Sequence, residues 1–294
     1  MITTNEFCQN EYGEKLYKIS FDAGFTCPGR DGRAGNRGCI FCSAGGSGDF
    51  AVRISDPESE KSIEAAKERV AKKFKGNRYI AYFQAFTGTY ADVETLRRIY
   101  IPIAKREDIA VVSIATRPDC LGDDVMDFLG ELSKIKPMWI ELGLQSTKEE
   151  SISYIRRGYK TSVYDEAVRK LNEMGIHTIT HVILYLPGES REDMLETVRH
   201  CVLAGTKGIK LQVLQILEGT DLASEYTKGA PIYIPTLEEY CETIKACVDE
   251  CPPDMVFHRI TGDPPKKLLI EPKWSADKKR VMATLKKCLF FGKI

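Results

Sequence analysis

The sequence predicts an α/β fold in which a parallel sheet, covered by helices, curls into a partial (β/α)6 TIM-like barrel with a C-terminal extension. The first observation is that six runs rich in Val, Ile and Leu alternate with amphipathic helical segments along most of the 294 residues. The second is that parallel strands joined by right-handed crossovers curl toward a barrel. We expect the barrel core over residues 1–230 and an α/β extension with a basic tail over 231–294.

The order of the strands and helices follows from the spacing of the apolar residues, which recur with a period of about two in strands and about 3.6 in helices. The strands are expected at 16–24, 78–86, 109–117, 138–146, 177–187 and 208–217. The helices are expected at 62–76, from Asp92 onward, and at 122–135, 162–175 and 190–205. After residue 222 the alternation fails, and we expect a helix over 236–251, a short strand over 255–260 and a final basic helix that together close one side of the barrel.

The charge balance argues against a general binder of polyanions, because 42 Lys and Arg residues face 42 Asp and Glu residues. The stretch 262–294 nevertheless carries nine basic residues against three acidic ones, which indicates either a solvated surface or a contact with nucleic acid. The first fifteen residues are polar and acidic, and no run reaches the roughly 18 apolar residues of a membrane span. We therefore expect a cytoplasmic protein that makes no contact with a membrane.

Three of the ten cysteines share one Gly-rich loop, "CPGRDGRAGNRGCIFC", directly after the first expected strand. In barrels of this kind the chemistry collects on loops at the carboxyl ends of the strands. A closed zinc site would need a fourth ligand, and no Cys or His pair at ligand spacing lies near Cys27, Cys39 and Cys42. Three thiolates suit a cubane iron-sulfur cluster better, with one iron left open. A zinc-stabilised binding protein without catalysis remains an alternative, and the other seven cysteines are expected to act as small hydrophobic residues.

The cysteine loop resembles the cluster motif of the radical S-adenosylmethionine (SAM) superfamily in a wide-spaced form, C-x11-C-x2-C. Further motifs of that resemblance occur in order as "YFQAFTGTYA", "SIATRPDC", "IELGLQS", "RRGY", "YLPGE" and "EGTDL". The wide form is similar to a bacterial subfamily related to the Elp3 and coproporphyrinogen-oxidase branch. Two positions depart from it: Tyr159 stands where His is expected, and Tyr185 stands where Gly is expected and narrows the barrel mouth.

The resemblance implies an enzyme with two cofactors. A [4Fe-4S] cluster on Cys27, Cys39 and Cys42 would bind SAM, and reductive cleavage of SAM would yield a 5'-deoxyadenosyl radical. The electron would come from a reducing protein such as flavodoxin or ferredoxin. The cluster cysteines are the part of the site that this resemblance identifies most directly.

The resemblance also implies cofactor contacts at the strand ends. Gln84 and Thr87 would meet the methionyl amino group, while Gln145 and Arg157 would contact ribose and carboxylate. Thr116 and His181 complete the expected set of cofactor-binding residues, which are Gln84, Thr87, Thr116, Gln145, Arg157 and His181. Three of these residues have an alternative role without a cofactor. Gln145 would cap a turn, Arg157 would lie on the surface of a helix, and His181 would be a core residue with its hydrogen bonds satisfied.

Glu141, Glu189 and Tyr185 are candidate catalytic residues, the two carboxylates for proton transfer. The resemblance to the Elp3 branch implies a role in modification of the tRNA wobble uridine. Arg30, Arg33 and Arg37 in the cysteine loop could neutralise phosphates, and a base would be splayed into the barrel. The alternative is a radical SAM oxidoreductase that acts on a small molecule such as a tetrapyrrole or an amino-acid derivative.

Overall fold

The computed structural model describes residues 1–54 and 60–291 and has a nine-stranded sheet in the order β1-β10-β8-β7-β6-β5-β4-β2-β3. All pairings within this sheet are parallel. The strands are β1 (Ile2–Thr3), β2 (Tyr17–Asp22), β3 (Val52–Arg53), β4 (Tyr79–Phe83), β5 (Ile109–Thr116), β6 (Met138–Gln145), β7 (His177–Leu184), β8 (Gly208–Val213) and β10 (Val256–Arg259). A separate antiparallel pair joins β9 (Ile216–Leu217) to β11 (Leu269–Glu271).

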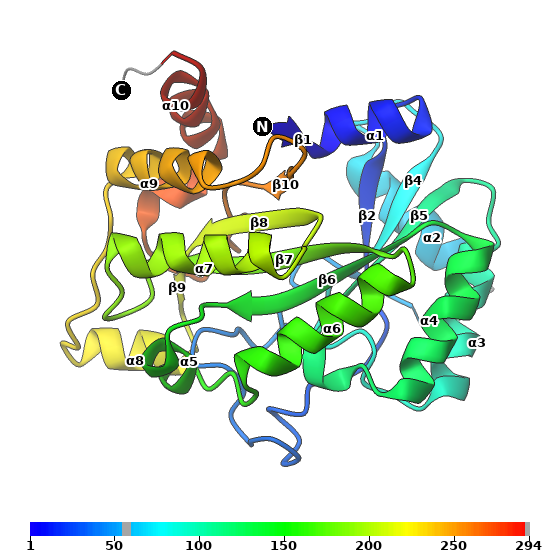
Figure 1. Ribbon diagram of the computed structural model, residues 1–294, viewed down its shortest axis with the longest axis horizontal. Helices are drawn as coiled ribbons and strands as arrows, with labels where there is room; N and C mark the ends of the chain where they lie inside the picture. The colour runs from blue at the N-terminus through cyan, green and yellow to red at the C-terminus, as the bar shows by residue number, and fades with distance from the viewer. Residues whose placement is uncertain (55–59, 292–294) are drawn as a thin grey trace.

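The six strands expected from the sequence are confirmed as β2, β4, β5, β6, β7 and β8, which are consecutive neighbours in the sheet. Every residue of β4 and β5 is buried, which explains why these strands appear as continuous apolar runs. The sheet curls, and the helices lie along its outer side (Figure 1). The partial barrel of the expected fold class is therefore the observed architecture.

The helices begin where the sequence supplies a cap. Ser190 and Thr236 each form a capping box with the acidic residue three positions later, and Asp92 accepts a hydrogen bond from the Thr95 amide at 2.9 Å. One expected end is wrong, since the helix over 62–76 stops at Val70. The helices are α1 (Thr4–Tyr12), α2 (Glu60–Val70), α3 (Val93–Ala104), α4 (Asp123–Ile135), α5 (Glu149–Tyr154), α6 (Thr161–Glu173), α7 (Arg191–Leu203), α8 (Asp221–Thr227), α9 (Leu237–Asp249) and α10 (Lys278–Phe291).

The alternation does not stop at residue 222, and this part of the expectation is wrong. Helix α9 leads into β10, which pairs in parallel with β8 and so adds a further strand to the same sheet. Strand β1 then pairs with β10, so that a segment from the start of the described chain forms this edge of the sheet. Buried residues of α9 and α10 belong to the core that fills the space between sheet and helices. A boundary at 230/231 stays a prediction.

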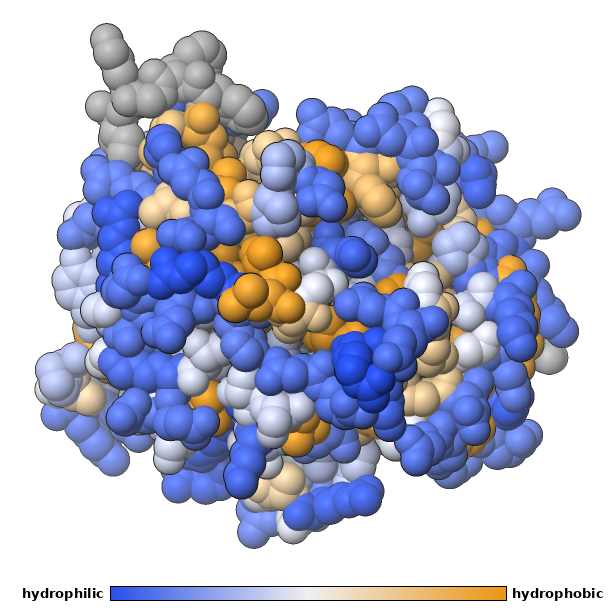
Figure 2. Space-filling model, viewed as in Figure 1, coloured by the Kyte–Doolittle hydropathy of each residue, from blue (hydrophilic) through white to orange (hydrophobic). Residues whose placement is uncertain are grey.

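The surface is largely hydrophilic on the face that carries α6 and α7, where hydrophobic residues form separate islands (Figure 2). Leu203 is the most exposed large hydrophobic residue of the described chain, at 86%. Within residues 1–54 and 60–291, no helix combines the length and apolar character that a membrane crossing requires.

Candidate active site

A cavity of about 240 Å³ opens at the carboxyl ends of the sheet strands and gathers most of the expected site residues. Its walls include the three cysteines of the loop and the residues that end β4, β5 and β6. The sequence-predicted residues that line it are Cys27, Cys39, Cys42, Gln84, Thr87, Thr116, Glu141, Gln145, Arg157 and His181. Residues far apart in the chain thus share one space, as the strand-end argument requires.

The cysteine loop is held in shape by its own backbone. The amide of Arg30 donates to the Cys27 carbonyl at 2.8 Å, and the amide of Cys42 donates to the Cys39 carbonyl at 3.0 Å. The Arg30 guanidinium then donates to the carbonyls of Cys42 and Ser43, at 3.1 and 2.6 Å. Arg30 therefore braces the loop, which leaves it poorly placed for the phosphate contact expected from the sequence.

Ile40, between two of the cysteines, anchors the loop to the other half of the barrel. Its amide donates to the Ile155 carbonyl at 3.3 Å, and its carbonyl accepts from the Leu222 amide at 2.9 Å. Its side chain is buried in a small apolar cluster, against which Phe41 packs. This cluster also contains Leu222 and Ala223, so the loop packs against α8 through Ile40.

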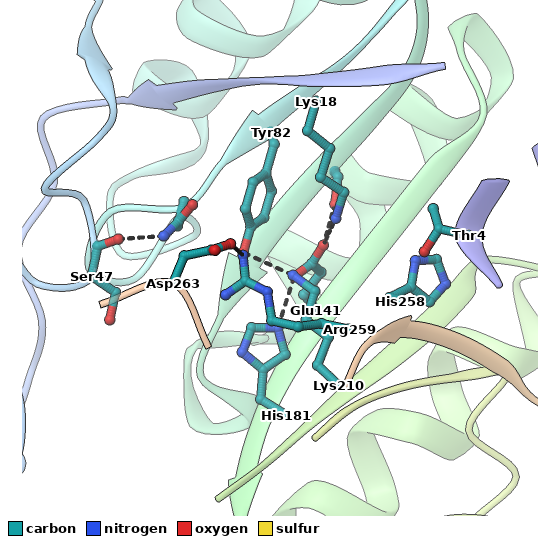
Figure 3. A network of polar contacts seen from close by, with 12 residues as sticks. Thr4, Lys18, Ser47, Tyr82, Glu141, His181, Lys210, His258, Arg259 and Asp263 are labelled. Carbon is teal, nitrogen blue, oxygen red and sulfur yellow. Dashed lines mark hydrogen bonds and ion pairs between the residues drawn. The ribbon is translucent and has the colours of Figure 1, made fainter. Parts of the chain in front are cut away.

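The loop also approaches the end of β4 closely, and a glycine permits this. Gly46 has a φ of +56° and its carbonyl accepts from the Phe86 amide at 2.8 Å. A Cβ atom at Gly46 would lie 2.3 Å from the Phe86 ring, so no larger residue fits without movement. The side-chain amide of Gln84 donates to the Ser47 carbonyl, which fastens the same segment to β4 (Figure 3).

The thiols have the chemistry that an iron-sulfur cluster requires. Burial raises the pKa of Cys39 to about 12, with the neighbouring Cys42 and Cys27 adding to the rise and Arg117 and Arg30 opposing it. Burial likewise raises the pKa of Cys42. Three thiolates crowded in one loop repel one another, so their ionisation calls for a positively charged partner between them. Such a donor set fits a [4Fe-4S] cluster.

A single metal ion suits the loop less well than a cluster. Over residues 1–54 and 60–291, no group of three or more His, Cys, Asp and Glu side chains is arranged to hold a metal ion. A cluster of four irons is wider than one ion, and its cysteine ligands need not converge on a point. This geometry disfavours the zinc alternative.

Two threonines at the ends of β4 and β5 offer different hydrogen-bonding capacity. The Thr87 hydroxyl is buried at the cavity wall and has no hydrogen-bond partner among the described residues. Thr116 lies 2.6 Å from the Thr89 hydroxyl, which donates to the Cys120 carbonyl at 2.8 Å, so the proton between the threonines belongs to Thr116. An unpaired buried hydroxyl costs free energy unless a ligand satisfies it, and Thr87 is therefore suited to a cofactor contact.

Gln145 ends β6 in a strained conformation. Its φ is +63°, and the pairing of β6 with β7 shifts register between Gly143 and Gln145. Phe86 and Tyr185, which follow β4 and β7, also have positive φ values, of 55° and 65°. Strained backbone conformations at non-glycine residues are typical of functional loops, and these three lie at or just after the carboxyl ends of β4, β6 and β7.

Arg157 is buried, at 1% exposure, so its assignment to a helix surface is wrong. Its guanidinium donates to the carbonyls of Leu144 and Ser146, both at 2.8 Å, and to the Tyr159 carbonyl at 2.9 and 3.1 Å. It also lies over the Tyr159 ring, 4.6 Å from the centroid. The guanidinium nitrogens of Arg157 are thus already bonded to protein acceptors. This favours a role for Arg157 in positioning the end of β6 over a role in binding the carboxylate of a ligand.

The floor of the cavity is a polar layer to which each of the six core strands contributes one side chain. These are Lys18 (β2), Tyr82 (β4), Ser113 (β5), Glu141 (β6), His181 (β7) and Lys210 (β8), and we call them the Glu141 network (Figure 3). Glu141 accepts from Lys18 at 2.7 Å, from Ser113 at 2.8 Å and from His181 at 2.7 Å, and it also pairs with Lys210. Lys210 in turn donates to the Tyr82 hydroxyl at 3.0 Å.

The protonation states of the Glu141 network follow from this arrangement. Lys18, Lys210 and His181 hold the pKa of Glu141 well below its ordinary value against the opposing effect of burial. Burial lowers the pKa of His181 to about 4, with Lys210 adding to the effect, so His181 is neutral near pH 7. Glu141 is thus a fixed anion, and its expected role in proton transfer is replaced by an electrostatic one.

The other two candidate catalytic residues do not lie among the described residues that line the cavity. Glu189 accepts a hydrogen bond from Ser146, and burial raises the pKa of its carboxyl group. The Tyr185 hydroxyl lies 2.7 Å from the Thr243 hydroxyl and donates to the Glu239 carbonyl at 3.0 Å, so this side chain points toward α9. Tyr185 therefore packs against the C-terminal extension and does not narrow the cavity.

Sequence reasoning missed several residues of the cavity and its floor. Lys18 and Lys210 interrupt apolar strands, and a single lysine in such a run was the available signal. Arg259, at the end of β10, also lines the cavity and comes from outside the six expected strands. A buried lysine requires a partner, so a carboxylate inside the barrel could have been inferred from the lysines.

These features define a class of protein, namely a partial-barrel enzyme with a cysteine loop after the first core strand. The model of the radical SAM superfamily matches residues 31–201, and that of the radical SAM C-terminal domain matches residues 206–289. The chain therefore belongs to the radical SAM superfamily and is a radical SAM enzyme. The matched range contains Cys39 and Cys42, while Cys27 precedes it.

Similar proteins agree with this assignment. The chain is 41% identical over 285 residues to the uncharacterized protein YtqA of Bacillus subtilis (strain 168), covering 97% of this chain and 88% of that protein. It is 29% identical over 161 residues to a tRNA uridine(34) acetyltransferase of Dehalococcoides mccartyi (strain CBDB1), covering 52% of this chain and 33% of that protein.

Two solved structures share the fold. One is an archaeal Elp3 of Methanocaldococcus infernus lacking its N-terminus, with a TM-score of 0.65, 17% identity and coverage of 93% of this chain and 65% of that chain. The other is the coproporphyrinogen III oxidase HemN of Escherichia coli, with a TM-score of 0.55, 16% identity and coverage of 80% and 52%. The fold expected from the resemblance is confirmed.

The Glu141 network leads to a prediction about stability. Glu141→Gln should lower the free energy of unfolding by about 3–5 kcal/mol, because it leaves Lys18 and Lys210 buried without a carboxylate. The pKa of Glu141 is depressed in the folded protein, so its contribution is complete well above the ordinary pKa of about 4.3 and is lost as the pH falls below it. Denaturant titrations at several pH values measure this difference.

The control is Glu173→Gln, which removes an exposed carboxylate that pairs with Arg169. This change should cost less than about 1 kcal/mol. Equal losses in the two variants would contradict the central role of Glu141.

Proposed function

We propose that this radical SAM enzyme cleaves SAM reductively at a [4Fe-4S] cluster held by Cys27, Cys39 and Cys42, and that its substrate is the wobble uridine of tRNA. The cleavage of SAM at this site is supported by one observation: the three cysteines and the polar residues at the strand ends line the same cavity. When bound, the cluster supplies the electron that splits SAM into methionine and a 5'-deoxyadenosyl radical. A reducing protein such as flavodoxin or ferredoxin is the proposed source of that electron.

The chain's own residues bind, orient and shield in this proposal. Arg117 lies beside the thiols, fixed by hydrogen bonds to Asp119 at 2.7 and 2.9 Å, and provides positive charge near the cluster loop. Gln84 and Thr87 are assigned to SAM, the Thr87 hydroxyl because it has no partner inside the described protein. Phe41 and the apolar cluster behind it keep water away from the reacting atoms.

The assignment of tRNA rests on relatives and on charge. A protein named tRNA uridine(34) acetyltransferase matches about half of this chain, as reported above. Arg33 is exposed on the cysteine loop near the Tyr90 ring, at 5.8 Å from its centroid, where a cation and an aromatic face could meet a nucleotide. Because the cavity lies inside a barrel, the target base must leave its stack to enter it.

The proposed function is tested by anaerobic reduction with dithionite and SAM in the presence of total tRNA, followed by nucleoside analysis. We expect 5'-deoxyadenosine and a SAM-dependent change at the wobble uridine. Formation of 5'-deoxyadenosine with unchanged tRNA nucleosides would favour the second candidate, a radical SAM oxidoreductase acting on a small molecule such as a tetrapyrrole or an amino-acid derivative.

Cys39→Ala should yield a folded protein that does not retain its cluster, because two thiolates grip a cubane poorly and the core does not depend on this loop. Iron and sulfide contents and the broad visible absorption after anaerobic reconstitution measure the effect. Cys201→Ala is the control, since Cys201 is buried in the core away from the cavity, and its iron content should match that of the wild type. Full absorption in Cys39→Ala would rule out the ligand assignment.

Thr87→Val should weaken SAM binding while leaving the free energy of unfolding unchanged or slightly raised, because the lost hydroxyl has no partner in the described protein. Thr89→Val makes the same chemical change two residues away. It should destabilise the protein by about 1–3 kcal/mol, because the Cys120 carbonyl and the Thr116 hydroxyl each lose a partner. Equilibrium dialysis of SAM and denaturant titration separate the two effects, and unchanged SAM affinity in Thr87→Val would remove Thr87 from the cofactor site.

If tRNA is the substrate, the basic helix α10 should form part of its footprint. Lys278 pairs with Asp263 at 2.6 Å, whereas Lys279 and Arg280 are exposed. The double variant Lys279→Gln/Arg280→Gln should weaken tRNA binding and reduce the slope of its salt dependence by about two, at about 0.9 per phosphate contact. SAM cleavage without substrate should persist.

The matched control for α10 is Lys72→Gln/Lys73→Gln, which removes the same charge from exposed residues just after α2, near the opposite edge of the sheet. Gel-shift titrations at two salt concentrations compare the three proteins. Equal binding by the two double variants would exclude α10 from the footprint.

A further inference from the structure

Arg259 brings a positive charge into the cavity from the C-terminal extension. It is the last residue of β10 and lines the same cavity as the cysteine loop, with its side chain 29% exposed. Figure 3 shows Arg259 and Asp263 beside Tyr82 and the Glu141 network. The charge of Arg259 therefore acts at the wall of the cavity, where a substrate would lie.

The local carboxylates do not balance this charge. Glu141 is shared by Lys18 and Lys210. Asp263 lies 2.6 Å from Lys278 but 3.7 Å from Arg259, so its closer partner is the lysine of α10. Arg259 thus shares its one carboxylate partner among the described residues with Lys278, and the positive charge of its guanidinium is only partly compensated at the cavity wall.

A second group that lines this cavity lacks a hydrogen-bond partner. The side-chain nitrogen of Gln215 is buried and has no hydrogen-bond partner among the described residues, although Gln215 lines the cavity. This nitrogen would lie 2.6 Å from a Cβ atom placed on Gly262, the neighbour of Asp263. An unsatisfied buried donor and an under-compensated guanidinium that line one cavity form the arrangement that an oxyanion would complete.

Arg259 acts on a different part of the cavity from the cations near the cysteines. Arg117 and Arg30 oppose the rise that burial causes in the pKa of Cys39. Arg259 instead opposes the rise that burial and Glu141 cause in the pKa of Tyr82, and it contributes to the lowered pKa of Lys210 after burial and Lys18. An anion at Arg259 would relieve the crowding of positive charge around Lys210 without involving the cluster loop.

We propose that Arg259 and the amide nitrogen of Gln215 form an oxyanion subsite that binds a carboxylate or phosphate group of the substrate. The subsite goes beyond the proposed function, because it would bind an anionic group of a nucleotide or of a small-molecule substrate alike. Its role is to orient the substrate: a charged group held at the β10 wall fixes which substrate atom faces the cofactor side of the cavity.

The test measures binding of simple probes to the reconstituted, SAM-loaded protein under anaerobic conditions. Dissociation constants for acetate, inorganic phosphate and neutral acetamide are obtained by ligand-observed NMR. We expect at least one of the two anions to bind about tenfold more tightly than acetamide, and the better of them identifies the group as carboxylate or phosphate. Equal binding of all three probes would overturn the proposal.

Variants connect this preference to the named residues. Arg259→Gln should abolish the preference for the anion, and Gln215→Leu should reduce it several-fold. Arg169→Gln, which removes an exposed arginine from α6, should leave it unchanged. An unchanged preference in Arg259→Gln would overturn the proposal.

One further variant keeps the test decisive if Arg259→Gln does not fold. Asp263→Asn removes the carboxylate that competes for Arg259 and should tighten anion binding several-fold. Unchanged or weaker anion binding in folded Asp263→Asn would contradict the subsite.

Discussion

The carboxylate of Glu141 lies inside the barrel with partners from β2, β5, β7 and β8 around it. A buried charge is costly unless its partners surround it, so these four strands can reach a low free energy only when the sheet curls enough to bring them to one point. Burial of the apolar residues stabilises the packing of helices on the sheet but does not specify how strongly the sheet curves. The Glu141 network supplies that specification, because a flatter sheet would leave Lys18 or Lys210 without its counter-ion.

The same curvature positions the cysteine loop. Once β2 lies near β8 across the barrel, the loop after β2 can reach the end of α5 and the first turn of α8, where Ile40 bonds to Ile155 and Leu222. The polar floor and the thiol loop therefore depend on one geometry, although their chemistry differs. A change in the floor would be transmitted to the loop through the strand positions, which makes the Glu141 network part of the site even where it touches no cofactor.

The sequence predicts the six core strands well because most of them are apolar runs, with β4 and β5 buried along their whole length, and buried parallel strands depend little on side-chain detail. The cysteine loop is predictable for a different reason, because the spacing of its three cysteines is unusual and all three lie within one short segment. Tyr185 and Glu189 were misplaced because nearness to a strand end in the chain does not reveal which way a side chain points, and the positive φ of Tyr185 directs it to α9. Arg259 was missed because its place depends on pairing between β10 and β8, which are distant in the chain.

The pairing of β1 with β10 has a consequence for how the chain is made. Ile2 pairs with Val256, so the second residue waits for a strand that is synthesised long after it. Until then the edge of β8 lacks its neighbour and exposes unpaired backbone groups, a state prone to association between chains. Contacts of such long sequence separation also slow folding, and the core strands from β2 to β8 can assemble before this edge is completed. Biosynthesis would therefore include an interval in which the strands from β2 to β8 have assembled but Arg259 has not yet reached the cavity.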